Sequence, residues 1–535
     1  MAQQENFDAI VIGAGQGGGP IASSFARDGR RTALIEREHA GGSYINWGCT
    51  PTKTMIASGR VAHVARRARG YGVHTGELRI DMERVRKRDV VQMFRDASRA
   101  SIEGTDGLEY IKKGEARFTG EKTIEVALDN GGNRSMRAET FVLDVGQRAR
   151  PLDLDIPAGV TILDNRSVME LDEVPEHLLV VGGGYVGIEF GQLFRRLGAE
   201  VTIVHRSDHL LSHEDPDVAE AVAEILREDG IALEMHTRPT GVTSRGEGIE
   251  VTIERSEDPP GTVFVSHVLA AAGRLPNTDS LDVEQTGLKL DDRGQIATDD
   301  RLETAVTGIY AIGDIRAGPK FTHISYDDYR ILRANLIDGG NRSVDDRPVP
   351  YTTFIDPQLG RIGLTERHAQ EQGIPYQVGR LQMSSVARAI ETDETRGMMK
   401  ALVHAETGRI LGAAVLGIEG GRNRGDAPDH HDGQSALHRP ARRCFRPPDA
   451  RRVPQQRLRE SAGPRVIADP GLRSCTRTTA TWIRCSARET IAAVDAETTA
   501  AMVVTPLPAS TAVDRRTSTR RALRPTQLPQ RQQAP

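Results

Sequence analysis

The sequence predicts an α/β protein with two Rossmann-like three-layer domains, a truncated α+β interface domain and a disordered tail. Three observations lead to this prediction. A strand, a glycine-rich turn, a helix and a second strand follow one another at residues 7–38, and the same order recurs at residues 177–208. Strand and helix patterns alternate up to about residue 420. Beyond that point the hydrophobic periodicity fades.

Length and composition indicate a cytoplasmic protein of several domains. A chain of 535 residues exceeds what one hydrophobic core supports. The net charge of −4 argues against a general nucleic-acid or membrane binder. No run reaches the roughly 18–20 apolar residues of a membrane span, and the N-terminus has no signal-peptide pattern. Four cysteines do not form a disulfide framework.

The first unit carries the glycine pattern G-x-G-x-x-G after the buried run DAIVI. Gly13 allows a tight turn, Gly15 lets the backbone approach a pyrophosphate, and Gly18 lets helix and strand pack closely. The helix N-terminus then supplies N–H donors. The second strand, TALIE, ends at Glu36, which lies 23 residues after Gly13 and can accept hydrogen bonds from ribose hydroxyls. The unit predicts a dinucleotide site; the alternative is a glycine-rich turn without a ligand.

The second unit repeats the pattern but replaces the carboxylate. Its loop glycines are Gly182, Gly184 and Gly187, and the position 23 residues after Gly182 is His205, followed by Arg206. A carboxylate would repel a 2′-phosphate, whereas an arginine pairs with one. This site therefore favours NADPH over NADH, unless both residues simply face solvent.

Two dinucleotide sites in one chain indicate a flavoprotein, with FAD in the first site and NAD(P)H in the second. The segment TAVTGIYAIGDI supports this reading, because it ends a predicted strand at Gly313 and Asp314. An aspartate at such a place can accept hydrogen bonds from a sugar-like chain such as ribityl.

The stretch GGSYINWGCTPTK at residues 41–53 contains Cys49, the only cysteine before residue 421. Thr50 is a good helix N-cap and Pro51 a good first helical residue, so the thiol is expected just before a helix N-terminus, where a thiolate is stabilised. Lys53 adds positive charge in the first turn. Such a thiolate suits a place beside a flavin; the alternative is a buried, inert cysteine.

This stretch resembles the redox loop of the FAD-dependent pyridine nucleotide-disulfide oxidoreductases, with the pattern G-G-T-C-x-N-x-G-C-x-P-[ST]-K. The resemblance extends over about residues 6–421 and includes AAAGRLPN at 270–277, FTHISYDDYR at 321–330 and YTTFIDPQLGRIGLTE at 351–366. Among the branches of the family, the sequence looks most similar to the mercuric-reductase-like and dihydrolipoamide-dehydrogenase-like ones.

The resemblance implies roles for individual residues. Cys49 would be the charge-transfer thiol, and Lys53 and Glu189 a flavin-side ion pair. Glu36 would bind the adenosine ribose and Asp314 the ribityl chain. The resemblance also implies a homodimer. Further cofactor contacts implied in the same way are Ala116, Gly146 and Gly273.

One residue of the loop departs from the family pattern. Tyr44 stands where the family has its first cysteine, the interchange thiol. Tyrosine has a pKa of about 10 and forms no mixed disulfide. The sequence therefore predicts an FAD-dependent NAD(P)H oxidoreductase that passes electrons to a quinone or another small, non-disulfide acceptor. The alternative is a defective flavoprotein that binds FAD without disulfide or metal reductase activity.

The predicted division of the chain follows from these segments. Residues 1–150 would form the first part of the FAD-binding domain and residues 281–345 its second part. Residues 151–280 would form the NAD(P)-binding domain. Residues 346–421 would form a partial dimerisation domain, and residues 422–535 a disordered tail outside the family pattern.

The tail differs from the rest of the chain in composition. Residues 422–535 contain 21 arginines and no lysine. The family's C-terminal His-Pro loop is missing from them, yet reading the tail one base out of frame permits such a loop, which predicts a frameshift near Gly421. A basic, nucleic-acid-binding arm is the less favoured alternative. No metal site is predicted, because Cys444, Cys475 and Cys485 are not adjacent.

Overall fold

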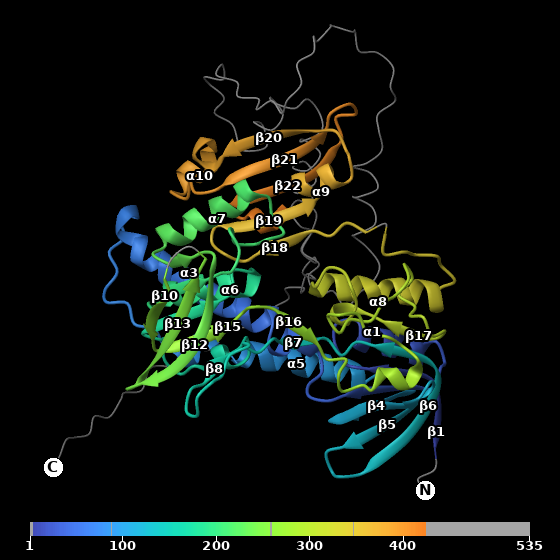
Figure 1. The fold of residues 1–535 in the computed structure, drawn as a ribbon. Coiled ribbons are helices and arrows are strands. Elements are labelled where there is room, and N and C mark those ends of the chain that lie inside the picture. Colours follow the sequence, from blue (N-terminus) through green and yellow to red (C-terminus); the bar gives the residue numbers. More distant parts are fainter. Residues whose placement is uncertain (1–3, 87, 257–258, 346, 424–535) are drawn as a thin grey trace, which may run out of the picture.

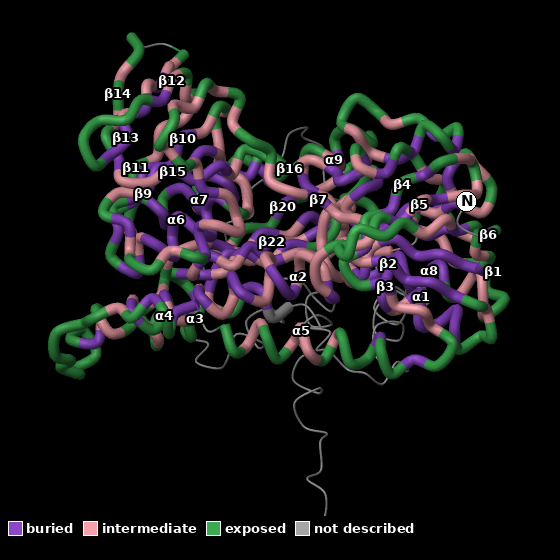
Figure 2. Tube along the Cα trace, turned by 90° about the horizontal axis from the view of Figure 1, so that it is seen from below, coloured by how far each residue is buried: buried purple, intermediate pink, exposed green. Residues whose placement is uncertain are grey.

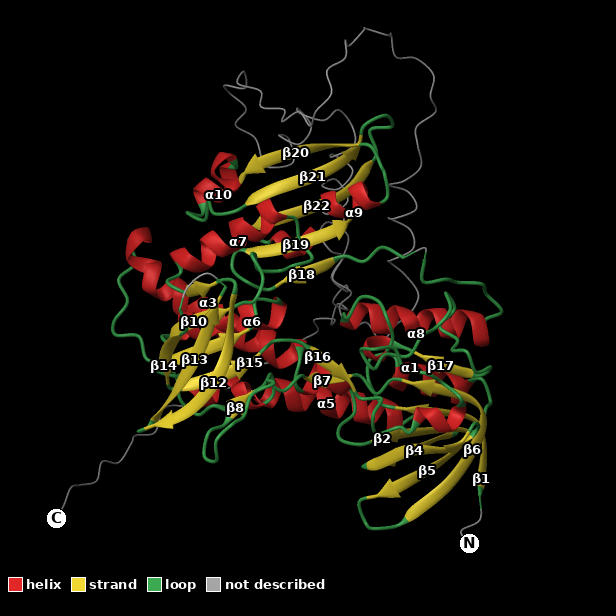
Figure 3. Cartoon of the chain, viewed as in Figure 1, coloured by secondary structure: helices red, strands yellow, loops and turns green. Residues whose placement is uncertain are grey.

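The computed structural model describes residues 4–86, 88–256, 259–345 and 347–423. Its longer strands gather into three groups that are well separated in Figure 3. Two groups belong to the two glycine-loop units, and the third is built from residues 351–417 (Figure 1). The predicted tail, apart from its first two residues, lies outside the described residues.

The first sheet carries the first glycine-loop unit. Its strands lie in the order β3-β2-β1-β6-β5-β4, and β17 pairs with the C-terminal half of β6. β1 is parallel to β2 and β6, whereas β4 and β5 form an antiparallel meander with the start of β6. The strands are β1 (Glu5–Ile12), β2 (Thr32–Glu36), β3 (Leu108–Lys112), β4 (Gly114–Gly120), β5 (Thr123–Leu128), β6 (Asn133–Leu143) and β17 (Ile309–Ala311).

The second sheet carries the second unit and is entirely parallel, in the order β11-β10-β9-β15-β8. A three-stranded antiparallel sheet, β12-β13-β14, accompanies it. The strands are β8 (Ile162–Leu163), β9 (His177–Val181), β10 (Glu200–Val204), β11 (Ala232–Glu234), β12 (Thr237–Arg245), β13 (Gly248–Arg255), β14 (Gly261–Val265) and β15 (His267–Ala270).

A short antiparallel ribbon joins the two units, because β7 follows β6 and β16 follows β15. The third sheet is antiparallel throughout, in the order β18-β19-β22-β21-β20. The strands are β7 (Gln147–Ala149), β16 (Arg274–Pro276), β18 (Tyr351–Thr353), β19 (Gln358–Gly363), β20 (Tyr376–Gln382), β21 (Met398–His404) and β22 (Ile410–Gly417).

The helices differ in how deeply they are buried. α6, which follows the second glycine loop, buries most of its residues, whereas α5 buries only Ile102 and lies along the outside (Figure 2). No helix among the described residues is long and apolar enough for a membrane span. The helices are α1 (Gly18–Arg27), α2 (Gly42–Asn46), α3 (Cys49–Arg67), α4 (Met82–Arg86), α5 (Arg88–Glu103), α6 (Tyr185–Leu197), α7 (Pro216–Glu228), α8 (Thr322–Leu336), α9 (Glu366–Glu371) and α10 (Ala387–Glu391).

One hydrophobic core joins the third sheet to the second unit. Leu359 on β19 and Leu416 on β22 are fully buried in the same cluster as Phe194 and Val222 from α6 and α7. Figure 1 shows α7 between this sheet and the second unit. Apolar contacts with α6 and α7 therefore hold the third sheet against the second unit.

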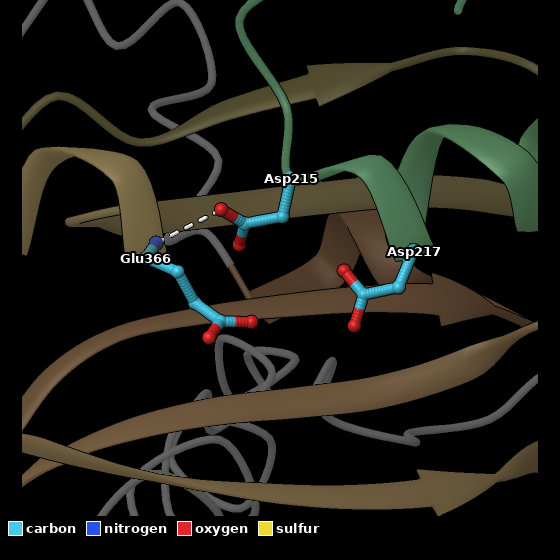
Figure 4. Close-up of side chains that lie close together, drawn as sticks. All are labelled: Asp215, Asp217 and Glu366. Atoms are coloured by element: carbon cyan, nitrogen blue, oxygen red, sulfur yellow. Dashed lines mark hydrogen bonds between the residues drawn. The ribbon is translucent and has the colours of Figure 1, made fainter. Parts of the chain in front are cut away.

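A buried ion network strengthens this docking. Lys400 on β21 is 2% exposed, and its Nζ lies 3.0 Å from Asp215 and 2.6 Å from both Asp217 and Glu366. Burial lowers the pKa of Lys400, but the hydrogen bonds to these carboxylates outweigh that effect and raise it. The three carboxylates have the spacing of a cation site (Figure 4), and the Lys400 ammonium, together with Arg361 beside Asp215 and Arg380 beside Asp217 and Glu366, supplies the positive charge there.

Replacing the ammonium tests this assignment. Lys400→Met removes the cation that pairs with all three carboxylates. Because Arg361 and Arg380 still pair with them, we expect the free energy of unfolding to fall by about 3 kcal/mol, the lower end for a broken buried ion pair. Urea denaturation measures the change. The matched control, Lys289→Met at an exposed position, should change stability by no more than about 0.5 kcal/mol. Equal urea midpoints for both variants would show that the network contributes nothing.

Candidate functional site

The first glycine loop leaves no room for side chains. Gly13 has a φ of +102°, and a Cβ there would stand 2.3 Å from the carbonyl oxygen of Asp144. A Cβ at Gly15 would stand 2.6 Å from Oδ2 of Asp144, and one at Gly18 would stand 2.0 Å from the carbonyl oxygen of Gly13. Because each contact is far shorter than real Cβ contacts, all three positions require glycine, as the dinucleotide pattern predicts.

Glu36 lies at the end of β2 and holds the loop in place. Its Oε2 accepts a hydrogen bond from the backbone N–H of Ala14 at 2.8 Å, and its Oε1 accepts from Glu38 N at 2.7 Å. Burial raises the pKa of Glu36, although both N–H donors oppose that shift. Each carboxylate oxygen retains a further lone pair, so Glu36 can hold the loop and still accept a ribose hydroxyl.

The second glycine loop repeats this geometry with a different acceptor. Nδ1 of His205 accepts a hydrogen bond from the backbone N–H of Gly183 at 3.1 Å, as Glu36 accepts from Ala14. Burial, followed by the neighbouring Arg206, lowers the pKa of His205, which keeps its ring neutral and able to accept. Arg206 is exposed beside it. His205 therefore holds the second loop in place through a hydrogen bond, a role that the sequence did not reveal.

The other glycines of this loop behave like those of the first. Gly182 has a φ of +121°, and a Cβ there would stand 2.4 Å from the carbonyl oxygen of Ala271. A Cβ at Gly187 would stand 1.9 Å from the carbonyl oxygen of Gly182. Gly184 is the N-cap of α6 and has no atom within 4 Å of its hypothetical Cβ, so the backbone is open there to a ligand.

Asp314 lies in a 3-10 turn, η4 (Gly313–Ile315), rather than in the strand that the sequence predicted. The strand β17 ends earlier, at Ala311, because Gly313 adopts a left-handed φ of +69° that breaks the extended backbone. Oδ2 of Asp314 lies 3.2 Å from Arg274. The carboxylate is only partly buried, which leaves it accessible to a ligand hydroxyl.

The three further cofactor contacts that the resemblance implies lie outside the two glycine loops. Gly146 follows β6 with a φ of +65°, and Gly273 lies before β16 with a φ of +133°. Both occupy the connections between the two units. Ala116 lies on β4 with its side chain in the hydrophobic core, so a cofactor can contact only its backbone.

Cys49 lies two positions further into the helix than the sequence predicted. Helix α3 begins at Cys49 with Gly48 as its N-cap, so Thr50 is not the cap and Pro51 is the third helical residue. The first turn is closed instead by Thr52, whose hydroxyl donates to the carbonyl oxygen of Gly48 at 2.7 Å. Proline remains compatible with this place, because first-turn N–H groups have no partner within the helix.

Two helix N-termini meet at the thiol. Sγ of Cys49 lies 3.7 Å from Oγ1 of Thr322, and these are the first residues of α3 and α8. Each helix N-terminus presents unpaired N–H groups and a partial positive charge. The sulfur therefore lies at the N-terminal ends of two helices and within reach of one hydroxyl.

The predicted partners Lys53 and Glu189 do meet. Nζ of Lys53 lies 2.6 Å from Oε2 of Glu189, which links α3 to α6. The other carboxylate oxygen accepts from the backbone N–H of Phe354 at 2.8 Å, and the Lys53 ammonium lies 4.6 Å from the centre of the Phe354 ring. Phe354, which the sequence did not single out, thus connects the redox helix to the third sheet.

Tyr44 lies on the short helix α2, half-buried, and the chain then folds back on itself. A Cβ on Gly48 would stand 3.3 Å from Cα of Tyr44. Trp47 lies in the same loop and has two further contacts. The Arg166 guanidinium lies 3.8 Å from the centre of the Trp47 ring, and the carbonyl oxygen of Trp47 accepts a hydrogen bond from Asn165 at 2.9 Å. A cavity of about 640 Å³ opens beside Trp47.

Asp144 is the residue of this site that sequence reasoning missed. It follows β6 directly, and its Oδ2 accepts from the backbone N–H of Gly18 at 2.7 Å, in the first turn of α1. The signal was present in the sequence FVLDVG, where a carboxylate ends a strand beside the glycine loop. The pattern could not show that β6 is the neighbour of β1.

These residues fit the FAD molecule that the two-site pattern implies. A Cβ at Gly13, Gly15 or Gly18 would clash with the chain, which keeps the turn short enough for a pyrophosphate to approach its backbone, and the N-cap residue of α1, Gly17, has no side chain to fill the place of the ligand. Glu36 lies at the end of β2, Asp314 in the turn η4 that follows β17, and Cys49 and Lys53 at the start of α3.

Comparisons with known proteins identify the family to which the chain is similar. The family model for pyridine nucleotide-disulphide oxidoreductase matches residues 7–328, and the model for the dimerisation domain of the same family matches residues 349–424. The second match covers the whole third sheet. It also reaches three residues beyond Gly421, where the sequence predicted that the family pattern ends.

Individual relatives cover most of the chain. The probable pyridine nucleotide-disulfide oxidoreductase RclA of Escherichia coli (strain K12) is 35% identical over 421 residues, 77% of this chain and 90% of that protein. A mercuric reductase of Streptomyces lividans is 33% identical, covering 77% and 86%. The solved Cu(II) complex of the HOCl-induced flavoprotein disulfide reductase RclA from Escherichia coli matches with a TM-score of 0.70 and 32% identity, covering 78% and 91%.

Proposed function

This chain belongs to the pyridine nucleotide-disulphide oxidoreductase family, an FAD-dependent family of NAD(P)H oxidoreductases, and we propose that it transfers electrons to a small acceptor that is not a disulfide. The observation that carries the proposal is Tyr44, which occupies the place of the family's interchange thiol next to Cys49. The mercuric-reductase relatives make small, non-protein acceptors a reasonable class to test.

We assign FAD to the first unit and NAD(P)H to the second. The Gly13–Gly18 loop would hold the pyrophosphate, Glu36 the adenosine ribose and Asp314 the ribityl chain. Bound FAD supplies a ring that accepts hydride and releases electrons to a second substrate. In this assignment the Lys53 ammonium, paired with Glu189, would supply positive charge beside the ring, and Cys49, at the N-termini of α3 and α8, would supply its sulfur.

The second unit favours NADPH. A carboxylate at position 205 would repel a 2′-phosphate, and His205 removes that charge while still accepting from Gly183. Arg206 follows it, is exposed, and takes part in no ion pair among the described residues, so its guanidinium can pair with the 2′-phosphate.

The alternative, a flavoprotein that binds FAD but does no chemistry, rests on the missing thiol and on the missing His-Pro loop of the family. That loop would fall beyond Asn423, outside the described residues. The two proposals differ in one measurable step, the reduction of bound FAD by NADPH.

Anaerobic mixing with NADPH tests this step. We expect the flavin absorbance of the purified chain to be bleached, and then restored on adding a quinone. Gly187→Ala is the control, because its Cβ would stand 1.9 Å from the carbonyl oxygen of Gly182 and deform only the second loop. That variant should keep FAD and respond to dithionite but not to NADPH. A parent chain that behaves like the variant would establish the alternative.

Restoring the missing thiol tests the role of Tyr44. Tyr44→Cys creates a thiol next to Cys49, and a disulfide between them takes up one further electron pair, with two protons, on reduction. An anaerobic dithionite titration should therefore require one more electron pair per FAD than the parent chain does. Tyr71→Cys, at an exposed position outside the loop, should not change the titration. An unchanged titration for Tyr44→Cys would contradict the assigned place of Tyr44.

Charge reversal at Arg206 tests the coenzyme preference. Arg206→Glu replaces the proposed phosphate partner with a carboxylate that repels the phosphate. We therefore expect the Kd for NADPH to rise by about tenfold or more, which corresponds to a loss of about 1.4 kcal/mol of binding free energy. The Kd for NADH should change little. Arg293→Glu makes the same charge change at an exposed site outside the second unit. Equal effects on both nucleotides would rule out a 2′-phosphate contact.

A further inference from the structure

Asp144 stands at the point where the two FAD-binding segments meet. The preceding strand β6 lies between β1, which leads into the Gly13–Gly18 loop, and β17, which leads into Gly313 and Asp314. The backbone N–H of Asp144 donates to Ile12 at 2.8 Å. Its side chain is 7% exposed.

The carboxyl group contacts both segments through positions that lack side chains. Oδ2 accepts from Gly18 N and would lie 2.6 Å from a Cβ on Gly15. Oδ1 would lie 2.8 Å from a Cβ on Gly313. Glycine at these positions is what lets a carboxyl group occupy the space directly behind the loop.

Among the ion pairs of the described residues, none includes Asp144. Burial raises the pKa of Asp144 well above its usual value, and the carboxylates of Asp314 and Asp328 add to that effect, whereas the N–H groups of Gly18 and Gly17 oppose it.

The basic groups of the neighbouring elements are already engaged. Arg347 lies 2.5 Å from Asp328, and Arg316 lies 3.5 Å from the same carboxylate. Arg274 lies 3.2 Å from Asp314, and Nζ of Lys320 donates to the carbonyl oxygen of Asp314 at 2.8 Å. These contacts leave Asp144 as the uncompensated acid of the cluster.

A dinucleotide brings two further negative charges to the same loop. The pyrophosphate of FAD would lie against the N–H groups of the Gly13–Gly18 turn, and Asp144 lies on the inner side of that turn. An ionised carboxylate there would repel the pyrophosphate in a region of low dielectric constant. A neutral carboxyl group would not, and its Oδ2 would still accept from Gly18.

We propose that Asp144 is a positioning residue of the FAD site that binds the cofactor in its protonated form, so that FAD binding is coupled to the uptake of one proton. This inference rests on the assignment of FAD to the first unit. It makes Asp144 the group that decides at which pH the chain retains its cofactor.

The sign of the pH dependence follows from linkage. If binding requires the neutral acid, FAD affinity is constant below the pKa of Asp144 in the FAD-free protein. Above that pKa each binding event must take up a proton, and affinity falls by up to about tenfold per pH unit. Alkaline conditions should therefore release FAD from a protein that is still folded.

The pH dependence of the Kd for FAD tests the proposal in the full chain. FAD is added back to the stripped protein between pH 6 and pH 10, and binding is followed by quenching of FAD fluorescence, with circular dichroism confirming the fold. We expect the Kd to rise at least tenfold across this range. Weakly buffered protein with a pH-indicator dye should also take up close to one proton per FAD bound on the alkaline side. A Kd that is independent of pH, without proton uptake, would overturn the proposal.

Asp144→Asn identifies the responsible group. Asparagine keeps an acceptor for Gly18 but cannot ionise, so this variant should bind FAD with a flat pH profile and more tightly than the parent at pH 10. Asp129→Asn, at an exposed turn of the same sheet, should keep the parent profile. Lys320 is the competing group, because burial lowers its pKa to about 8. If Asp144→Asn retains the parent pH dependence, Lys320 and not Asp144 controls binding.

The outcomes separate this inference from the proposed function. If FAD fails to bind at every pH, the assignment of the first unit is wrong. If FAD binds with a flat profile and is reduced by NADPH, the enzyme proposal stands and only the role of Asp144 falls.

Discussion

The close approach of a glycine to a neighbouring strand end is the constraint on which both nucleotide units depend. Gly13 is pressed against the end of β6, at Asp144, and Gly182 is pressed against the end of β15, at Ala271. In each case a left-handed φ turns the chain and a third glycine lets the helix pass over the first. A methyl group at any of these positions would separate the helix from the sheet and remove the site.

The two loops also share a hydrogen bond. A side chain at the end of the second strand accepts it from a backbone N–H group of the loop. Glu36 does this in the first unit and His205 in the second. The same hydrogen bond can thus be made by a group that carries charge and by one that does not. This exchange keeps one loop geometry in both units while changing the side chain at the end of the second strand.

The redox centre is assembled from parts that are distant in the sequence. Cys49 meets Thr322, and Lys53 meets Glu189, which in turn holds Phe354 at the start of the third sheet. The third sheet is further anchored by the buried Lys400 network. Helix α3, helix α6 of the second unit and the third sheet are therefore joined by consecutive polar contacts through Glu189.

The sequence by itself determined the two glycine units, their strands and the identity of the redox loop, because glycine spacing and hydrophobic runs are local properties of the chain. The strand TALIE, for example, is β2 residue for residue. Local signals were less accurate at element ends, where Gly48 rather than Thr50 caps α3 and Gly313 ends β17 early. Only the tertiary structure decided that Asp144 lies behind the first loop, that His205 accepts from the second, and that Thr322 faces Cys49. Each of these contacts depends on which strand lies next to which, and strand order is fixed by packing between distant segments.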